Sequence, residues 1–236
     1  MKNFLSIFIA FILIASGSYL NAQKVLTKGT VVMEITNVKS DDPQMEMGLA
    51  AMKGSQTELI FDEKKYVTNM DMMGGMISMK TKIQTGENKM DLLMDAMGNK
   101  IWVESELDKA QSASEKEMAG KSKITYDKND IKTILGYKCY KMTLTNPEMG
   151  DFKISGYVTP DIKTNANLVQ GFQAVNFDGY LVEYTVENPQ FSMTMTAVKI
   201  LDTVDESKFV FDTKGYKKMT MEEFQKSMGA MSGMGF

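Results

Sequence analysis

Methionine is the residue type in this chain whose number and spacing could support binding chemistry. The 236 residues include 23 methionines, and many of them stand only two or three positions apart. The closest groups are Met45-x-Met47, residues 70–79, residues 90–97, Met193-x-Met195, Met219-x-Met221 and Met228-x-x-Met231-x-x-Met234. Thioether sulfur is a soft ligand that suits Cu(I). One interpretation is therefore a copper-binding protein that uses these clusters.

The same spacings have two other interpretations. Residues two apart in a strand, or three apart in a helix, share one face, so these methionines could simply fill a core. Methionine is also unbranched and polarizable, so it repacks around ligands of different shape. A curved sheet whose concave face carries methionine and aromatic residues could hold an acyl chain or another apolar ligand. We adopt this binding interpretation and keep copper binding and plain core filling as alternatives.

The remaining reactive side chains indicate a protein without catalysis. The chain contains no histidine, which excludes Ser/His/Asp and Cys/His nucleophile systems and imidazole zinc sites. Cys139 is the only cysteine, so no internal disulfide can form, and we interpret it as a buried small residue. The paired carboxylates, which we place at turns or solvent faces, are Asp62/Glu63, Asp91/Asp95 and Glu222/Glu223. We expect no catalytic residues, no cofactor and no metal site in this interpretation.

The first 22 residues have the pattern of a secretory signal peptide. Lys2 gives a positive start, residues 4–15 are almost entirely apolar, and residues 16–22 are small and polar, ending at Ala22. The apolar run of roughly twelve residues is too short to span a membrane. We expect cleavage after Ala22 and a periplasmic or extracellular protein with no integral membrane anchor.

Charge gives no indication of a nucleic-acid partner. The chain has 27 basic and 30 acidic residues and a formal net charge of -3, too small to drive binding to nucleic acid. The sequence leaves the oligomeric state open. We divide the chain into a signal peptide (residues 1–22), a sheet domain (residues 23–218) and a C-terminal helix with a flexible tail (residues 219–236).

The dominant pattern after residue 28 has a period of two. In residues 191–197 every second residue is apolar, and residues 180–186 alternate in the same way, as half-buried antiparallel strands do. We predict further strands at residues 31–35, 58–62, 65–71, 77–85, 100–104, 124–127, 134–145, 152–158 and 208–212. Residues 90–97 fit a strand or a helix, and we favour a strand because Gly98-Asn99 would then form a hairpin turn. About ten strands joined by hairpins result.

Three segments have helical spacing instead. They are residues 43–54, 106–121 and 221–231. The last has the clearest start, because Thr220 and Glu223 form the pattern of a capping box, in which each side chain accepts a hydrogen bond from the other residue's backbone. We expect this helix to lie against the sheet.

Two stretches of sequence resemble a known bacterial family. They are residues 133–141 (TILGYKCYK) with residues 156–161 (GYVTPD), and residues 209–212 (FVFD) with residues 215–219 (GYKKM). The chain resembles the exported family called domain of unknown function 4412, over nearly the whole length after the leader. That family is similar to the LolA/LppX-like lipoprotein-carrier class, which implies a curved antiparallel sheet wrapped as an incomplete barrel around helices and a hydrophobic groove. The resemblance implies no activity and no site residues.

Together these observations predict a mostly β protein of the α+β class. We expect a strongly curved antiparallel sheet, an incomplete barrel, with a few helices covering its concave face. The predicted function is an exported, non-enzymatic carrier of a hydrophobic ligand or lipid acyl chain. The alternatives are a Cu(I)-binding protein and a structural or envelope-stress interaction protein. The side chains predicted to form the wall or lid of the binding cavity are Met193, Met195, Tyr184, Met79, Ile83 and Phe224.

Overall fold

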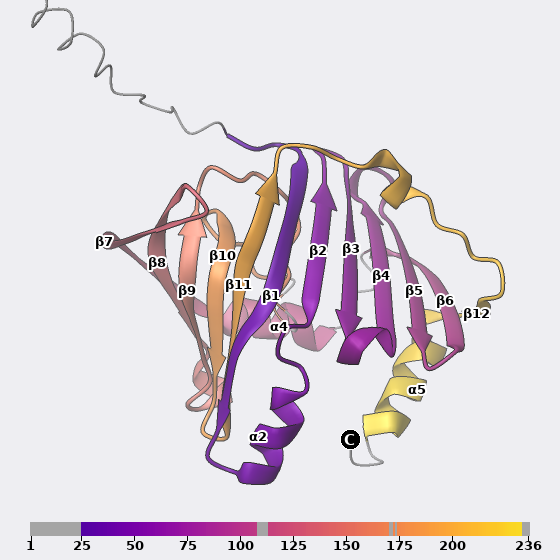
Figure 1. Ribbon diagram of the computed structural model, residues 1–236, viewed down its shortest axis with the longest axis horizontal. Coiled ribbons are helices and arrows are strands. Elements are labelled where there is room, and N and C mark those ends of the chain that lie inside the picture. Colours follow the sequence, from indigo (N-terminus) through magenta and orange to yellow (C-terminus); the bar gives the residue numbers. More distant parts are fainter. Residues whose placement is uncertain (1–24, 108–112, 170–171, 173, 233–236) are drawn as a thin grey trace, which may run out of the picture.

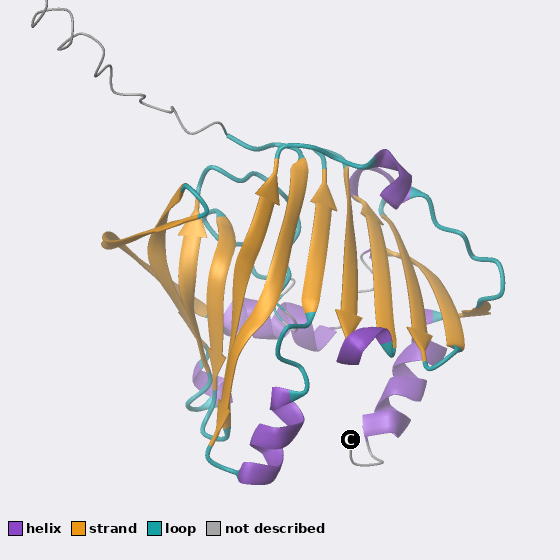
Figure 2. Cartoon of the chain, viewed as in Figure 1, coloured by secondary structure: helices purple, strands orange, loops and turns teal. Residues whose placement is uncertain are grey.

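One large, open, curved antiparallel sheet dominates the computed structural model, which describes residues 25–107, 113–169, 172 and 174–232 (Figures 1 and 2). Its 12 strands within the described residues lie in the order β12-β6-β5-β4-β3-β2-β1-β11-β10-β9-β8-β7. The strands are β1 (Gly29–Ser40), β2 (Gln56–Phe61), β3 (Lys65–Met72), β4 (Ile77–Gln84), β5 (Lys89–Ala96), β6 (Asn99–Glu106), β7 (Lys123–Ile134), β8 (Tyr137–Thr145), β9 (Lys153–Thr159), β10 (Tyr180–Glu187), β11 (Phe191–Leu201) and β12 (Lys217–Met219). The predicted fold class is confirmed.

Short helical segments connect or flank the strands. The α-helices are α2 (Pro43–Ala50), α4 (Ala113–Lys121) and α5 (Met221–Ser232), and the short 3-10 helices are η1 (Met73–Gly75), η2 (Thr85–Glu87), η3 (Pro147–Met149) and η4 (Glu206–Phe209). The predicted capping box at α5 is confirmed: the backbone N–H of Glu223 donates to Thr220 Oγ1 at 3.2 Å, and the backbone N–H of Thr220 donates to Glu223 Oε2 at 2.8 Å. The predicted signal peptide lies outside the described residues.

The strand order follows the chain, as the hairpin signals predict. Neighbours from β2 to β6 and from β7 to β11 are consecutive in sequence and antiparallel, and β1 joins the two halves by pairing with both β2 and β11. The exception is β12, which pairs with β6 in parallel. Residues 90–97 form a strand, as expected, because β5 spans Lys89–Ala96 and pairs with β6 across the Gly98 turn.

Two predicted strands differ in the structure. Residues 134–145 are divided, because Leu135 and Gly136, with φ of 50° and 85°, turn the chain between β7 and β8. Residues 208–212 form no strand: Lys208 and Phe209 end η4, and Phe209 is buried against Ile60 and Val67 on the convex face of the sheet. The alternating phenylalanines of that segment are therefore explained by packing against a face of the sheet and not by pairing with an edge strand.

The connection between β9 and β10 covers only one half of the concave face. The described residues of the connection between β9 and β10 (160–169, 172 and 174–179) fold back onto the strands from β7 to β11 and onto β1. Its buried side chains Ile162, Val169 and Phe172 belong to the large hydrophobic cluster of that half. The other half, from β3 to β6, is joined by short connections, and its smaller cluster contains Phe224 of α5. Consequently the second half keeps free space above the sheet.

The C-terminal segment links the two faces of the sheet. It runs from η4 on the convex face to β12 at the edge, and α5 then continues toward the concave side (Figure 1). Lys218 of β12 is tied to the convex face, since its Nζ lies 2.7 Å from Glu104 Oε2 and 4.4 Å from the ring centroid of Trp102. The position of α5 therefore depends on how firmly β12 is attached to β6.

Acid should loosen this attachment. Hydrogen bonds from Lys218 and Lys89 lower the pKa of Glu104 from 4.5 to about 2. A carboxyl group whose pKa is depressed by folding stabilises the fold fully above its ordinary pKa, and that contribution disappears as the pH falls toward the depressed value. Trp102 is the only tryptophan, so its fluorescence reports on this site. We expect acid to change the fluorescence of Trp102 in the wild-type protein. In Glu104→Gln this change should be absent, or already present at neutral pH. An unaltered acid transition in that variant would show that Glu104 is not responsible for the change.

Candidate ligand-binding cavity

A cavity of about 1600 Å³ lies on the concave face over the strands from β2 to β5, between the sheet and the helices α4 and α5. Its walls come from β2 to β5, α4, α5 and the connection between β9 and β10. Ligand pockets in proteins commonly enclose roughly 300–1,000 Å³, so this space is large enough for a ligand with long apolar parts. The cavity opens at one end of the sheet, because the rim residues Met73, Met76 and Met97 both line it and are exposed to solvent.

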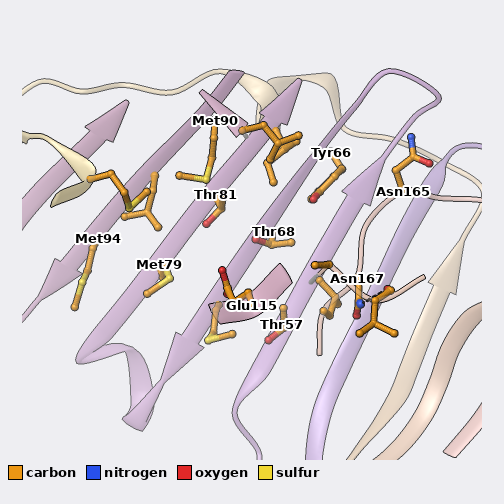
Figure 3. Close-up of a pocket in the computed structure, with 18 of the residues that line it drawn as sticks. Thr57, Tyr66, Thr68, Met79, Thr81, Met90, Met94, Glu115, Asn165 and Asn167 are labelled. Carbon is orange, nitrogen blue, oxygen red and sulfur yellow. Dashed lines mark hydrogen bonds between the residues drawn. The ribbon is translucent and has the colours of Figure 1, made fainter. Parts of the chain in front are cut away.

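Methionine is the most frequent residue type in the cavity wall. The nine methionines that line it are Met70, Met72, Met73, Met76, Met79, Met90, Met94, Met97 and Met221. Strand register explains their grouping: Met70 of β3 stands opposite Met79 of β4, which stands opposite Met94 of β5. Side chains at directly opposed positions share a face of the sheet, so these three form one row across the cavity floor. Met79 and Met94 are visible side by side in Figure 3.

The connection between β9 and β10 forms one end of the cavity. Asn167 holds this irregular segment together, because its side-chain amide donates to the carbonyls of Phe172 at 2.6 Å and Val175 at 2.9 Å. Its carboxamide oxygen accepts a hydrogen bond from the backbone N–H of Val169. These bonds satisfy backbone groups that no sheet ladder reaches. The connection is therefore a shaped wall of the cavity.

Two helices face the sheet across the cavity. Glu115 and Ala119 of α4 and Met221 and Phe224 of α5 are among the lining residues. Phe224 is buried and packs with the cluster of β4 to β6, so α5 covers part of the space as a lid. By contrast, α2 has no buried residue and does not line the cavity.

Polar groups interrupt the apolar wall near its middle. Tyr66, Thr68 and Thr81 contribute hydroxyl groups from β3 and β4, and Glu115 contributes a carboxylate from α4 (Figure 3). Burial raises the pKa of Tyr66 to about 12, so its phenol keeps its proton at neutral pH and can donate a hydrogen bond. The cavity is thus amphipathic, since these and further polar side chains share its wall with the apolar ones.

The structure separates the six residues predicted to form the cavity. Met79, Ile83 and Phe224 line it together. Tyr184 and Met195 are buried in the large cluster, where the Tyr184 hydroxyl lies 2.9 Å from Met195 Sδ, and Met193 packs against that cluster. The reason is the position of β10 and β11, which lie under the β9–β10 connection and not beside the open half. The binding role of all six stays a prediction.

Several lining residues were missed by the sequence analysis although a signal for some of them exists. Met70, Met94, Thr68 and Thr81 occupy alternate positions on consecutive strands, and hairpin register could have placed them in rows with Met79. No comparable signal exists for Glu115, because its position depends on how a helix folds across the sheet.

The described part of the chain contains no group of three or more His, Cys, Asp or Glu side chains that could hold a metal ion. Cys139 is buried, as predicted, and burial raises the pKa of its thiol to about 11. A membrane-crossing helix is not found either, since none in the described residues is long and apolar enough.

Fold and cavity together define a class of protein: an open curved antiparallel sheet with a large methionine-lined cavity on its concave face. No protein-family model matches the chain, and a search of curated proteins finds no match. Membership of the exported family resembled by residues 133–141 therefore stays a prediction.

Solved structures with some similarity to this chain include two mycobacterial proteins. The Mycobacterium tuberculosis lipoprotein LppX has 11% identity and a TM-score of 0.37, covering 79% of this chain and 92% of its own. LprF from Mycobacterium bovis has 14% identity and a TM-score of 0.33, and the similarity covers 78% of this chain and 90% of LprF. A protein of the domain-of-unknown-function 1329 family from Desulfovibrio piger has 9% identity and a TM-score of 0.35. The similarity covers 80% of this chain and 92% of that protein. Because all three scores are below 0.5, the case for a function depends on the cavity itself.

Proposed function

We propose that this protein is a non-enzymatic carrier that holds a hydrophobic ligand, such as a lipid acyl chain, in the cavity between the sheet and α5. The observation that supports the proposal is the cavity of about 1600 Å³, walled by methionine, leucine and isoleucine and open at one rim. A predicted signal peptide in residues 1–22 adds the expectation that the carrier acts outside the cytoplasm.

The energetics of such a ligand favour the cavity. Each methylene group removed from water contributes about 0.8 kcal/mol, so a chain of about ten methylenes gains on the order of 8 kcal/mol before the cost of immobilising it. Flexible methionines such as Met79, Met90 and Met94 can adjust to the ligand without the strain that branched side chains would cause. The wall therefore suits long, flexible ligands better than one rigid shape.

Two measurements test the carrier function. Protein purified under native conditions is extracted with organic solvent, and the extract is examined by mass spectrometry for lipid. The delipidated protein is then titrated with the neutral dye N-phenyl-1-naphthylamine, and the bound dye is displaced with long-chain amphiphiles. We expect co-purified lipid or saturable dye binding that such compounds reverse. Absence of lipid together with absence of saturable dye binding would refute the function.

Cu(I) binding is a second candidate because the row formed by Met70, Met79 and Met94 brings three thioethers to adjacent strand positions. Its test is competition with a Cu(I)-specific chelator in two triple variants. One changes the row to leucine, and the other changes Met228, Met231 and Met234, whose side chains lie outside the described part of the chain. If copper binds in the cavity, only the variant in which the row is changed to leucine should lose its Cu(I) to the chelator. If wild-type protein yields all its Cu(I) to the chelator, this candidate is excluded.

A further inference from the structure

We propose that the mouth of the cavity contacts the surface of a lipid bilayer, so that a lipid can move between the membrane and the cavity without crossing water. The contact would be made by the methionine rim, which we define as Met73, Met76 and Met97. All three line the cavity and are exposed to solvent. This inference rests on the proposed carrier function and names the surface with which the carrier exchanges its ligand.

Exposed methionines gather at one end of the sheet. Among the residues whose side chains the structure describes, the exposed methionines are Met47, Met73, Met76, Met97 and Met149. They lie in the β1–β2, β3–β4, β5–β6 and β8–β9 connections, which the antiparallel register brings to the same end (Figure 1). The exposed Leu135, by contrast, lies in the turn between β7 and β8 at the opposite end. A gathering of exposed apolar side chains indicates an interaction surface.

Two residues of the methionine rim occupy backbone positions that disfavour methionine. Met73 and Met97 have φ of 53° and 52°, in the left-handed region that residues with a side chain rarely adopt. Glycine or asparagine fills such turn positions at lower cost. Met73 and Met97 are also 48% and 76% exposed, so core packing does not require them. A contact outside the molecule explains why methionine stands at both turns.

The chemistry of the rim suits a bilayer. Methionine side chains are uncharged, unbranched and flexible, so they can enter among acyl chains without a partner surface of fixed shape. Charged groups stand directly behind the β5–β6 turn, where Lys100 Nζ lies 3.8 Å from Asp95 Oδ2. An apolar tip followed by a charged pair matches the order of acyl chains and headgroups in a lipid leaflet.

An apolar path connects the rim with the interior of the cavity. Behind the rim, Met72 of β3, Ile77 of β4 and Ala96 of β5 stand opposite one another and line the cavity. The row formed by Met70, Met79 and Met94 follows two positions further along the same strands. An acyl chain that left through water would expose all its methylene groups, whereas a rim resting on a membrane keeps them in apolar surroundings. A bilayer supplies both the ligand and an apolar surface for the rim, so it is the partner to which this continuity points.

The first test is flotation of the delipidated protein with phosphatidylcholine vesicles. Because uncharged side chains make the contact, we expect binding to these neutral vesicles that persists at high salt. The double variant Met73→Asn and Met97→Asn should bind at least about tenfold more weakly. Its urea midpoint should equal or exceed that of the wild type, because asparagine tolerates the left-handed backbone better. Loss of binding would therefore not result from unfolding.

The matched control is Leu135→Asn, which makes the same change at an exposed turn residue with φ of 50° at the opposite end of the sheet. We expect this variant to bind vesicles like the wild type. Equal losses in the control and in the double variant would overturn the inference. So would a wild-type protein that stays free of vesicles. Self-association of the wild type that the double variant lacks would then identify a second copy as the partner of the rim.

The second test measures transfer of a pyrene-labelled fatty acid from the protein to phosphatidylcholine vesicles. If the rim contacts the bilayer, the transfer rate rises in proportion to vesicle concentration, and the double variant transfers at least about tenfold more slowly. A rate independent of vesicle concentration would mean release through water, which overturns the inference and leaves the carrier function intact. Failure of the wild type to bind the labelled fatty acid or N-phenyl-1-naphthylamine would instead refute the carrier function, and the inference with it.

Discussion

Replacing Met79 with glutamate should reduce the affinity for N-phenyl-1-naphthylamine by at least about a hundredfold, the largest effect expected of any change in the cavity. Met79 is the central residue of the row and has Met70 and Met94 as its strand neighbours. A carboxylate at this position would stand on an apolar floor and would have to lose its hydration before an apolar ligand could cover it. The side chains of methionine and glutamate are similar in length, so the sheet itself should tolerate the change.

The measurement is a dye titration combined with circular dichroism and thermal unfolding to show that Met79→Glu remains folded. Met47→Glu is the matched control, because Met47 is 73% exposed on α2 and is not among the lining residues. We expect normal binding in the control and in the conservative variant Met79→Leu. Wild-type affinity in folded Met79→Glu would show that the ligand binds elsewhere.

The second large effect concerns stability. Gly156→Ala should lower the free energy of unfolding by about 3 kcal/mol, because a β-carbon there meets backbone atoms that cannot move aside. Gly156 lies in β9 opposite Tyr184 of β10, next to a register shift between Leu181 and Glu183. An added Cβ would overlap the carbonyl oxygen of Glu183 and would lie 2.9 Å from Cα of Tyr184. Relief of this overlap requires β9 and β10 to separate.

Urea denaturation of the two alanine variants at Gly156 and Gly86 tests this explanation. Gly86 is the control because a Cβ added there has no heavy atom within 4 Å. We expect Gly86→Ala to have nearly wild-type stability and Gly156→Ala to unfold at a clearly lower urea concentration. Similar midpoints for the two variants would mean that the close approach of β9 and β10 has little energetic weight.

The local elements of the fold could be predicted because their signals are local. Alternation identified β10 and β11, hairpin turns ordered the strands, and the pair Thr220/Glu223 identified the start of α5. The expected strand at residues 208–212 was wrong, because alternation reports burial of every second side chain. Phe209 obtains that burial from the convex face of β2 and β3 and not from a strand partner.

The candidate site was less predictable than the fold. Met79, Ile83 and Phe224 were placed in the cavity by pattern alone, whereas Tyr184 and Met195 have the same pattern and lie in the core. Alternation shows that a side chain faces inward. It does not show whether another segment covers that side chain.

The sequence by itself determined the strand periodicity and the inward-facing methionines of the strands, since both depend on residues close together in the chain, and the signal peptide stays a prediction. Only the tertiary structure decided where the interior stays open. The described residues between β9 and β10 (160–169, 172 and 174–179) pack over the strands from β7 to β11, while the short turns between β3 and β6 leave that half to α4 and α5. The physical reason is that covering a sheet requires a long connection to return across it, and the place of its return depends on contacts between residues far apart in sequence.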